Sequence, residues 1–182
     1  MPAMSASHRE TKRLRLVAHA PKHMLALIQG EDFYERSFGW RPAAGLRDFI
    51  VSNDVSPDYL ARLDGSAAAD PWMHGFGLIH IDTGTVIGFG GFKAPPGDDG
   101  MVEIAYAVVP DYQGKGFATE AAQALVAYAF NSGRVRMVRA HTLPEPNAST
   151  RVLARCGFRH MGEVTDPEDG LVWRWEKENE TA

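Results

Sequence analysis

The segment Val108–Ala121 has the residue types and spacing with the clearest chemistry in this chain. Gly114 and Gly116 flank Lys115 after an apolar run, and an alanine-rich helical pattern begins at Phe117. The first backbone N–H groups of a helix have no internal partner, and the helix dipole adds partial positive charge there. Glycine allows close backbone approach and positive φ. The segment therefore predicts an anion site that suits a diphosphate-bearing ligand.

The glycine spacing excludes two common phosphate-binding patterns. A Walker loop needs Ser or Thr after its lysine, whereas Gly116 follows Lys115. A dinucleotide-binding fingerprint needs a third glycine where Thr119 stands. The pattern that does fit is Gln-x-x-Gly-x-Ala, which Gln113, Gly116 and Ala118 form.

This pattern resembles motif A, the loop that holds the pyrophosphate of acetyl-coenzyme A in the GNAT acetyltransferase superfamily. Two further motifs are similar to those of its Rim-type branch, which is named for acetyltransferases of ribosomal-protein N-termini. Residues 103–106 precede the loop as Glu-Ile-Ala-Tyr, and residues 149–158 follow it as a Ser-x-Arg-Val-Leu…Gly-Phe signature. The opening residues 11–16 are also similar, so the resemblance extends from Thr11 to Glu176.

The resemblance implies acetyl-coenzyme A as cosubstrate and a primary amine as acceptor, either a protein N-terminus or a small molecule. It also implies a possible homodimer. The residues implied to hold the cofactor lie at the end of a strand, in the loop, at the helix start and in a later loop. They are Val108, Val109, Gln113, Gly114, Lys115, Gly116, Phe117, Ala118, Thr119 and Asn147.

Acetyl transfer requires an amine that has lost its proton and a proton for the departing thiolate. Glu103 is the candidate general base, directly or through a water; a salt-bridged strand carboxylate is the alternative interpretation. Ser149 is the candidate for donating a proton or hydrogen bond to the sulfur, and its alternative is a helix N-cap. Because no activated nucleophile is visible, direct attack of the amine in a ternary complex is favoured.

Three positions depart from the resembled pattern. Pro146 occupies the usual asparagine position, and Asn147 is one residue too close to Ser149. Leu153 stands where many members have a tyrosine, and Met161 where some of the branch have a glutamate. The departures at Asn147 and Met161 leave an alternative function open, namely a coenzyme A-binding sensor or interaction module with little or no catalysis.

The remaining reactive side chains predict no second site. The seven histidines have no metal-ligand spacing, so no metal is expected, and only His141 ends a strand near the Asn147 loop. Cys156 is expected to be a small buried residue. A single cysteine cannot form an internal disulfide, which indicates a reducing, cytoplasmic setting.

Composition limits the class of protein. With 182 residues and a hydrophobic share of 45%, we expect a disordered tail over residues 1–10 and a single acetyltransferase domain over 11–182. A net charge of −4 argues against nucleic acid as a partner. No apolar run approaches the length of a membrane span, so no membrane partner is expected.

Hydrophobic periodicity predicts an α+β fold with a central mixed, mostly antiparallel sheet flanked by helices, in the order β-α-α-β-β-β-α-β-α-β-β. Strands are expected near residues 14–17, 77–81, 85–89, 102–109, 135–142, 158–164 and 171–176. Helices are expected from Pro21 to Gly30 and over 31–38, 116–131 and 149–156, with two short ones near 47–51 and 57–63. The acceptor pocket is expected from segments 32–70 and 166–170, with Trp40 as a wall.

Overall fold

The computed structural model describes residues 8–52 and 57–181. Its strands are β1 (His8–Glu10), β2 (Leu14–Ala18), β3 (Arg41–Pro42), β4 (Phe76–His80), β5 (Thr85–Phe92), β6 (Met101–Val108), β7 (Met137–Thr142), β8 (Arg159–Asp166) and β9 (Gly170–Glu178). They form one mixed sheet in the order β1-β2-β4-β5-β6-β7-β9-β8, with β3 beside β5. The predicted α+β class is confirmed.

The helices follow the predicted order, with additions. They are α1 (Pro21–Gln29), α2 (Glu31–Phe38), α3 (Asp48–Val51), α4 (Pro57–Ala61), α5 (Pro71–His74), the 3₁₀ turn η1 (Pro110–Tyr112), α6 (Phe117–Asn131) and α7 (Ala148–Arg155). The sequence pattern did not predict α5, η1, β1 or β3. A cap explains α5, because the Asp70 side chain accepts a 2.9 Å hydrogen bond from the Trp72 N–H. None of the helices described is long and apolar enough to span a membrane.

The expectation of a disordered tail over residues 1–10 is wrong for its last three residues. His8–Glu10 pairs antiparallel with β2, and the Glu10 carboxylate accepts a 2.6 Å hydrogen bond from Arg15. Cross-strand pairs of this kind stabilise an edge strand that has little apolar content. Residues 1–7 of the expected tail lie outside the described part of the chain.

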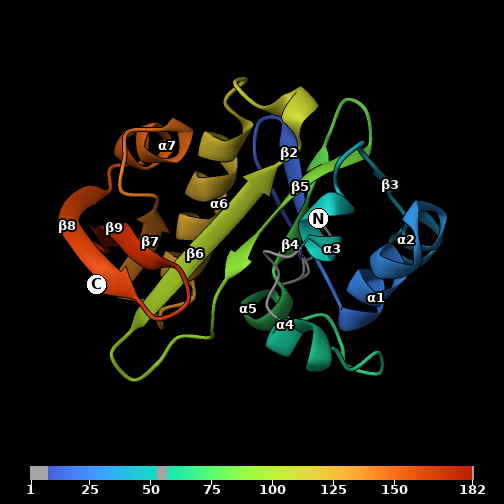
Figure 1. Ribbon diagram of the computed structural model, residues 1–182, viewed down its shortest axis with the longest axis horizontal. Coiled ribbons are helices and arrows are strands. Elements are labelled where there is room, and N and C mark those ends of the chain that lie inside the picture. The colour runs from blue at the N-terminus through green and yellow to red at the C-terminus, as the bar shows by residue number, and fades with distance from the viewer. Residues whose placement is uncertain (1–7, 53–56, 182) are drawn as a thin grey trace.

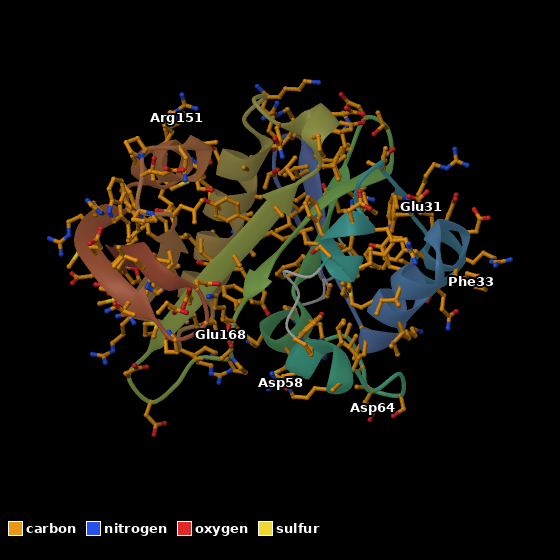
Figure 2. The ribbon with its side chains drawn as sticks, viewed as in Figure 1. Glu31, Phe33, Asp58, Asp64, Arg151 and Glu168 are labelled. Carbon is orange, nitrogen blue, oxygen red and sulfur yellow. The ribbon has the colours of Figure 1, made fainter. Side chains whose placement is uncertain are left out.

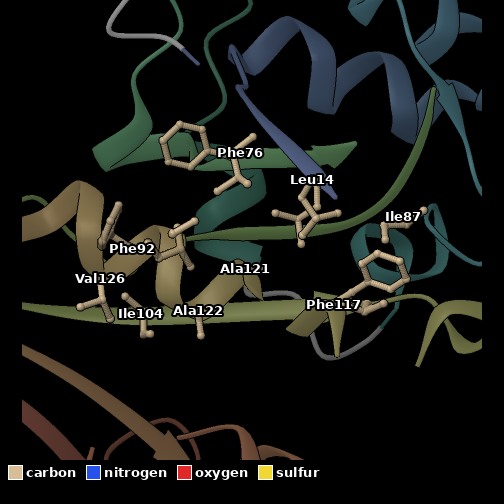
Figure 3. Close-up of a cluster of buried hydrophobic side chains, with 14 of the residues drawn as sticks. Leu14, Phe76, Ile87, Phe92, Ile104, Phe117, Ala121, Ala122 and Val126 are labelled. Carbon is tan, nitrogen blue, oxygen red and sulfur yellow. The ribbon is translucent and has the colours of Figure 1, made fainter. Parts of the chain in front are cut away.

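Helix α6 packs along one face of the sheet and forms much of the core. Its buried side chains lie against apolar residues of β2, β4, β5 and β6 (Figure 3): Phe117, Ala121, Ala122 and Val126 face Leu14, Phe76, Ile87, Phe92 and Ile104. Burial of each large apolar side chain contributes about 1.5–3 kcal/mol. The packing holds the first turn of α6 at the end of β6.

Helices α1 and α2 cover the opposite face. A Cβ on Gly77 of β4 would lie 2.9 Å from the Phe38 ring of α2, so the helix packs tightly there. His19 is buried beside them, with Nε2 2.7 Å from the Tyr34 hydroxyl. Burial, together with the positive charges that His23 and His74 can carry, lowers the pKa of His19 to about 3. On the outer side of α2, Phe33 points away from the sheet (Figure 2).

Strand β6 crosses the middle of the molecule, with α1–α3 on one side and α7 and β7–β9 on the other (Figure 1). Its residues Ile104–Val108 pair with Gly88–Phe92 of β5, whereas only Met101–Glu103 pairs with β7. Beyond Glu103 the strands β6 and β7 diverge. We call the space between them the gap.

Candidate active site

The backbone of β6 presents hydrogen-bonding groups to the gap. The Val109 N–H donates to the Ile87 carbonyl at 2.9 Å, and the Glu103 carbonyl accepts from the Lys93 N–H at 2.9 Å. Main-chain groups of a strand alternate in direction, so those of Tyr106 and Val108 face the gap instead. Of the two strand residues predicted to hold the cofactor, Val108 therefore faces the gap. Val109 is fully buried, and its N–H is already used.

The loop after β6 has the conformation expected of an anion site. Gly114 and Gly116 have φ of 72° and 85°, in the left-handed region that favours glycine. Within the described residues, the N–H groups of Gly114 to Thr119 donate to no acceptor, and the first N–H of α6 to do so is that of Glu120. No atom lies within 4 Å of a Cβ built on Gly114. Six consecutive free donors beside open space suit a diphosphate.

The other predicted loop residues support this conformation. Gln113 Nε2 donates to the Val108 carbonyl at 2.8 Å, which ties the loop to β6. Lys115 is exposed, and its Nζ donates to the Asp111 carbonyl at 2.9 Å. The Phe117 side chain is buried in the core, whereas Ala118 is partly exposed at the start of α6.

Arg13 fixes the loop from β2's side of the sheet, a role that the sequence analysis did not assign to it. Its Nη1 donates to the Lys115 carbonyl and its Nε to Glu120, each at 2.9 Å. Its guanidinium carbon lies 4.1 Å from the centre of the Phe117 ring. Burial opposes the ionisation of Glu120, but hydrogen bonds from Thr11 and Arg13 outweigh it and lower the pKa of the carboxyl.

Glu103 is held by two neighbours through one of its oxygens. His141 Nδ1 lies 2.7 Å from Oε1, and Lys93 Nζ lies 3.0 Å from the same atom. His141 Nε2 accepts a 3.2 Å hydrogen bond from Arg174, so Nδ1 carries the proton that Oε1 accepts. Oε2 has no partner among the described residues. The salt-bridged reading of Glu103 is thus correct for one oxygen, while the other can accept a proton.

Lys93 was not singled out by the sequence analysis. Its partial burial lowers its pKa, but the hydrogen bond and charge of Glu103 and the carboxylates of Asp169 and Asp166 raise it above its ordinary value. Asp169, in the β8–β9 turn, lies 3.7 Å from Lys93 Nζ. Lys93 is therefore a cation near neutral pH, and its ammonium group is paired with the Glu103 carboxylate.

The N-cap of α7 is Asn147, not Ser149. Asn147 Oδ1 accepts a 2.9 Å hydrogen bond from the Thr150 N–H, so the alternative interpretation of Ser149 as N-cap is wrong. The cap also occupies the oxygen with which Asn147 could have contacted a cofactor. Ser149 lies beside Tyr106: burial raises the pKa of that phenol, and the hydrogen bond with Ser149 offsets part of the rise.

A cavity of about 210 Å³ in the gap brings the two predicted catalytic residues together. Glu103 from β6 and Ser149 from α7 line it, together with His141, Tyr106 and Asp169. Asp169 belongs to segment 166–170, where we expected part of the acceptor pocket.

A larger cavity of about 500 Å³ lies between β5–β6 and helices α1, α3, α4 and α5. Its lining is rich in aromatic side chains, namely Phe49, Tyr59, Phe76, Phe89, Phe92 and Tyr106. Four of its lining residues, including Phe49 and Tyr59, come from segment 32–70, where part of the acceptor pocket was expected. Trp40 is not among its described walls and lies near Arg15 instead, 5.7 Å from the guanidinium carbon.

The structure also shows the burial and contacts of four other side chains that the sequence brought into question. Met161 on β8 is exposed, and Leu153 on α7 is buried. Cys156 is buried and burial raises the pKa of its thiol, which makes it a packing residue. His74 lines the larger cavity, and its buried Nδ1 has no hydrogen-bond partner among the described residues. No group of metal-ligating side chains occurs in the part of the chain described.

Comparison with known proteins gives one consistent family. The profile of the acetyltransferase (GNAT) domain matches residues 13–159. The chain is 36% identical over 123 residues to an uncharacterized N-acetyltransferase, p20, of Bacillus licheniformis. That alignment covers 67% of this chain but 62% of the relative, which is less than two thirds of its length.

Two solved structures share the fold over most of both chains. One is the RimL ribosomal L7/L12 alpha-N-protein acetyltransferase in complex with coenzyme A, with a TM-score of 0.65, 17% identity and coverage of 94% of this chain and 97% of that one. The other is a ribosomal-protein-S5-alanine acetyltransferase from Vibrio fischeri, with a TM-score of 0.62, 17% identity and coverage of 95% and 97%. The resemblance inferred from the sequence motifs is confirmed.

Proposed function

The chain belongs to the acetyltransferase (GNAT) domain family, an acyltransferase family that uses acetyl-coenzyme A, and from this premise we propose that it acetylates a primary amine by direct attack in a ternary complex. The observation that carries the proposal is the pairing of an unpartnered N–H cradle with a gap that contains Glu103 and Ser149. The acceptor is a peptide N-terminus or a small-molecule amine.

The cofactor fits the residues that surround the gap. The free N–H groups from Gly114 to Thr119 match a diphosphate, and the open space at Gly114 leaves room for it. The main-chain groups of Tyr106 and the N–H of Val108 can bond the amides of a pantetheine arm, whereas the Val108 carbonyl already accepts from Gln113. When bound, the cofactor supplies the acetyl group as an activated thioester.

Glu103 and Ser149 perform the proton transfers in this proposal. Glu103 Oε2 takes the proton of the incoming ammonium, directly or through a water, while Lys93 and His141 hold Oε1. The nitrogen–carbon bond forms as the carbon–sulfur bond breaks, and the second proton that the nitrogen loses passes to the departing sulfur, so that the products are the acetylated amine and the free thiol of coenzyme A. The Ser149 hydroxyl then stabilises the departing thiolate by donating to it.

One observation favours a second candidate, a coenzyme A-binding module with little catalysis. Glu103 is already engaged by two neighbours, as a purely structural carboxylate would be. Release of free thiol from acetyl-coenzyme A, measured across a panel of amines and N-terminal peptides, separates the two functions. Release that depends on the acceptor and falls in Glu103→Gln supports the acetyltransferase. Cofactor binding without release on any acceptor contradicts it and supports the binding module.

A further inference from the structure

The floor of the larger cavity is made of small residues. Gly91 of β5 pairs with Ala105 of β6, and Ala107 follows on the same side of the sheet as Glu103. A Cβ on Gly91 would lie 2.9 Å from the Cα of Gly75, so glycine is required for α5 to close against β5. The small floor leaves a hollow above the sheet, and the volume of about 500 Å³ lies within the range of sites for drug-sized ligands.

The walls of this cavity are aromatic and apolar. Phe49 and Phe89 meet edge to face with ring centres 6.2 Å apart, and Tyr59, Phe92 and Met24 continue the lining. Aromatic walls bind a flat apolar body through area burial and edge-to-face contacts, the latter contributing about 0.5–1.5 kcal/mol per ring pair. A small polar amine would leave most of this surface without a partner.

The charge of the lining argues against an acceptor with several ammonium groups. Among the described lining residues Lys93 is the one permanent charge, and it is paired with Glu103. His74 is the other basic group, and burial lowers its pKa, so it is neutral near pH 7. No carboxylate of the described chain lines the cavity. A second ammonium group inside it would therefore be buried without a counter-charge from the described lining residues, which is costly.

The cavity opens toward the candidate catalytic residues. Lys93, Ala105 and Tyr106 line both this cavity and the smaller one that contains Glu103 and Ser149. A molecule seated on the aromatic walls can therefore extend a single amine past Ala105 toward Glu103 Oε2.

We infer that the acceptor is an arylalkylamine, a primary amine with one cationic group on an aromatic body, bound with its ring in the larger cavity. The inference rests on the proposed function for the chemistry at the amine. The aromatic lining, the small floor and the absence of a described carboxylate carry the choice of substrate class.

The first test is a comparison of kcat/KM with acetyl-coenzyme A for 2-phenylethylamine, ethanolamine, spermidine and a peptide that begins with serine. We expect 2-phenylethylamine to exceed each of the others by about tenfold or more, since even one methylene in an apolar pocket changes specificity about 10–200-fold. Equal or greater kcat/KM for spermidine, ethanolamine or the peptide overturns the inference.

The second test reduces the volume of the larger cavity with a bulkier side chain on its floor. Ala105→Leu places a larger side chain in the hollow, whereas Ala154→Leu makes the same change at an exposed position of α7. Relative to Ala154→Leu, Ala105→Leu should raise KM for 2-phenylethylamine at least tenfold. Its effect on KM for ethanolamine should be smaller. Thermal unfolding verifies that both variants fold. An equal effect on both amines contradicts the inference.

Calorimetry with the coenzyme A-saturated protein distinguishes a failure of the proposed function from a failure of the inferred substrate class. If no amine is acetylated but 2-phenylethylamine binds, and Ala105→Leu weakens this binding at least tenfold, the proposed function fails and the inference stands. If spermidine or the peptide is acetylated while 2-phenylethylamine neither binds nor reacts, the function stands and the inference fails. If no amine reacts and 2-phenylethylamine does not bind, both fail.

Discussion

His141 Nδ1 and Glu103 Oε1 lie 2.7 Å apart across the point where β6 and β7 diverge. Because Arg174 donates to the other ring nitrogen, the imidazole is held as the tautomer that donates to Glu103. Lys93, the residue that follows β5, reaches the same carboxylate oxygen. The side chains of His141, Arg174 and Lys93 thus fix one carboxylate oxygen, and the second oxygen has no partner among the described residues.

Replacement of this carboxylate tests its role as base. Glu103→Gln should lower kcat by about 10²-fold or more, because positioned proton transfer contributes about 10²–10⁴-fold. Glu176→Gln is a matched control. Glu176, like Glu103, is a half-buried strand carboxylate with a basic partner, which here is Arg139, but it lines neither cavity of the site. Steady-state kinetics with a saturating acceptor measure kcat for both variants. A similar kcat for the two variants would refute the assignment.

The start of α7 carries both a capping residue, Asn147, and the proposed catalytic residue Ser149. Asn147→Ala removes the N-cap and should lower the free energy of unfolding by about 1 kcal/mol. Ser149→Ala keeps the cap and should lower kcat with little change in stability. Urea unfolding and steady-state kinetics on the two variants give the comparison. A stability loss in Ser149→Ala that matches that of Asn147→Ala would contradict this division.

The two loop glycines should affect cofactor affinity. Alanine at a left-handed position costs about 1–2 kcal/mol, so Gly114→Ala and Gly116→Ala should both unfold more easily and bind coenzyme A more weakly. Gly116→Ala should be the more severe, because its Cβ would lie 3.1 Å from Arg13 Nη2.

The control for these glycines is Gly133→Ala, beyond the far end of α6. Gly133 has φ of 72° and no atom within 4 Å of its Cβ position, like Gly114. It should lose similar stability while keeping its affinity for coenzyme A in calorimetry. An affinity loss equal to that of Gly114→Ala would show that strain, not the cradle, weakens binding.

His19 should make the fold sensitive to acid. Its pKa in the folded state, about 3, is below the ordinary value of 6.5, so the unfolded chain binds a proton that the folded chain refuses. The contribution of neutral His19 is fully present above pH 6.5 and is lost as the pH falls toward 3. The pKa of His23 is lowered to about 4 by burial and by Lys22, so it adds to the loss in the same direction.

The measurement is the free energy of unfolding in urea between pH 7 and pH 4. Tyr34→Phe serves as the background, so that no hydroxyl is left unpaired when the imidazole is removed. His19→Phe in that background should flatten the pH dependence by about 1.4 kcal/mol per pH unit below pH 6. Parallel pH profiles for the two proteins would contradict this origin.

Local sequence was sufficient to predict the conformation of the glycine loop and the start of α6. The β6 strand, the glycine loop and α6 follow one another along the chain, so their spacing alone predicted the positive φ of Gly114 and Gly116 and the helix start at Phe117. Lys93 was missed because it meets Glu103 only through the register of β5 against β6. Sheet register depends on long-range packing that no short motif records.

The larger cavity, which we propose for the acceptor, was predicted only as a region. Short helices with irregular connections build it, and α5 was missed since four residues carry too little periodicity to predict a helix. Trp40 was expected as a wall from its place in the chain, whereas the aromatic residues that line the cavity come from several separate elements. Tertiary packing, and not local pattern, determines that surface.

The short pairing of β6 with β7 has a consequence for the lifetime of the protein. The main-chain groups of Tyr106 and the N–H of Val108 leave part of an internal sheet edge open, and an open edge invites pairing with another chain. A bound ligand in the gap covers this edge and adds stability by mass action, about 2.7 kcal/mol at a hundred times its dissociation constant. Resistance to aggregation and proteolysis should therefore rise and fall with the metabolic supply of the ligand.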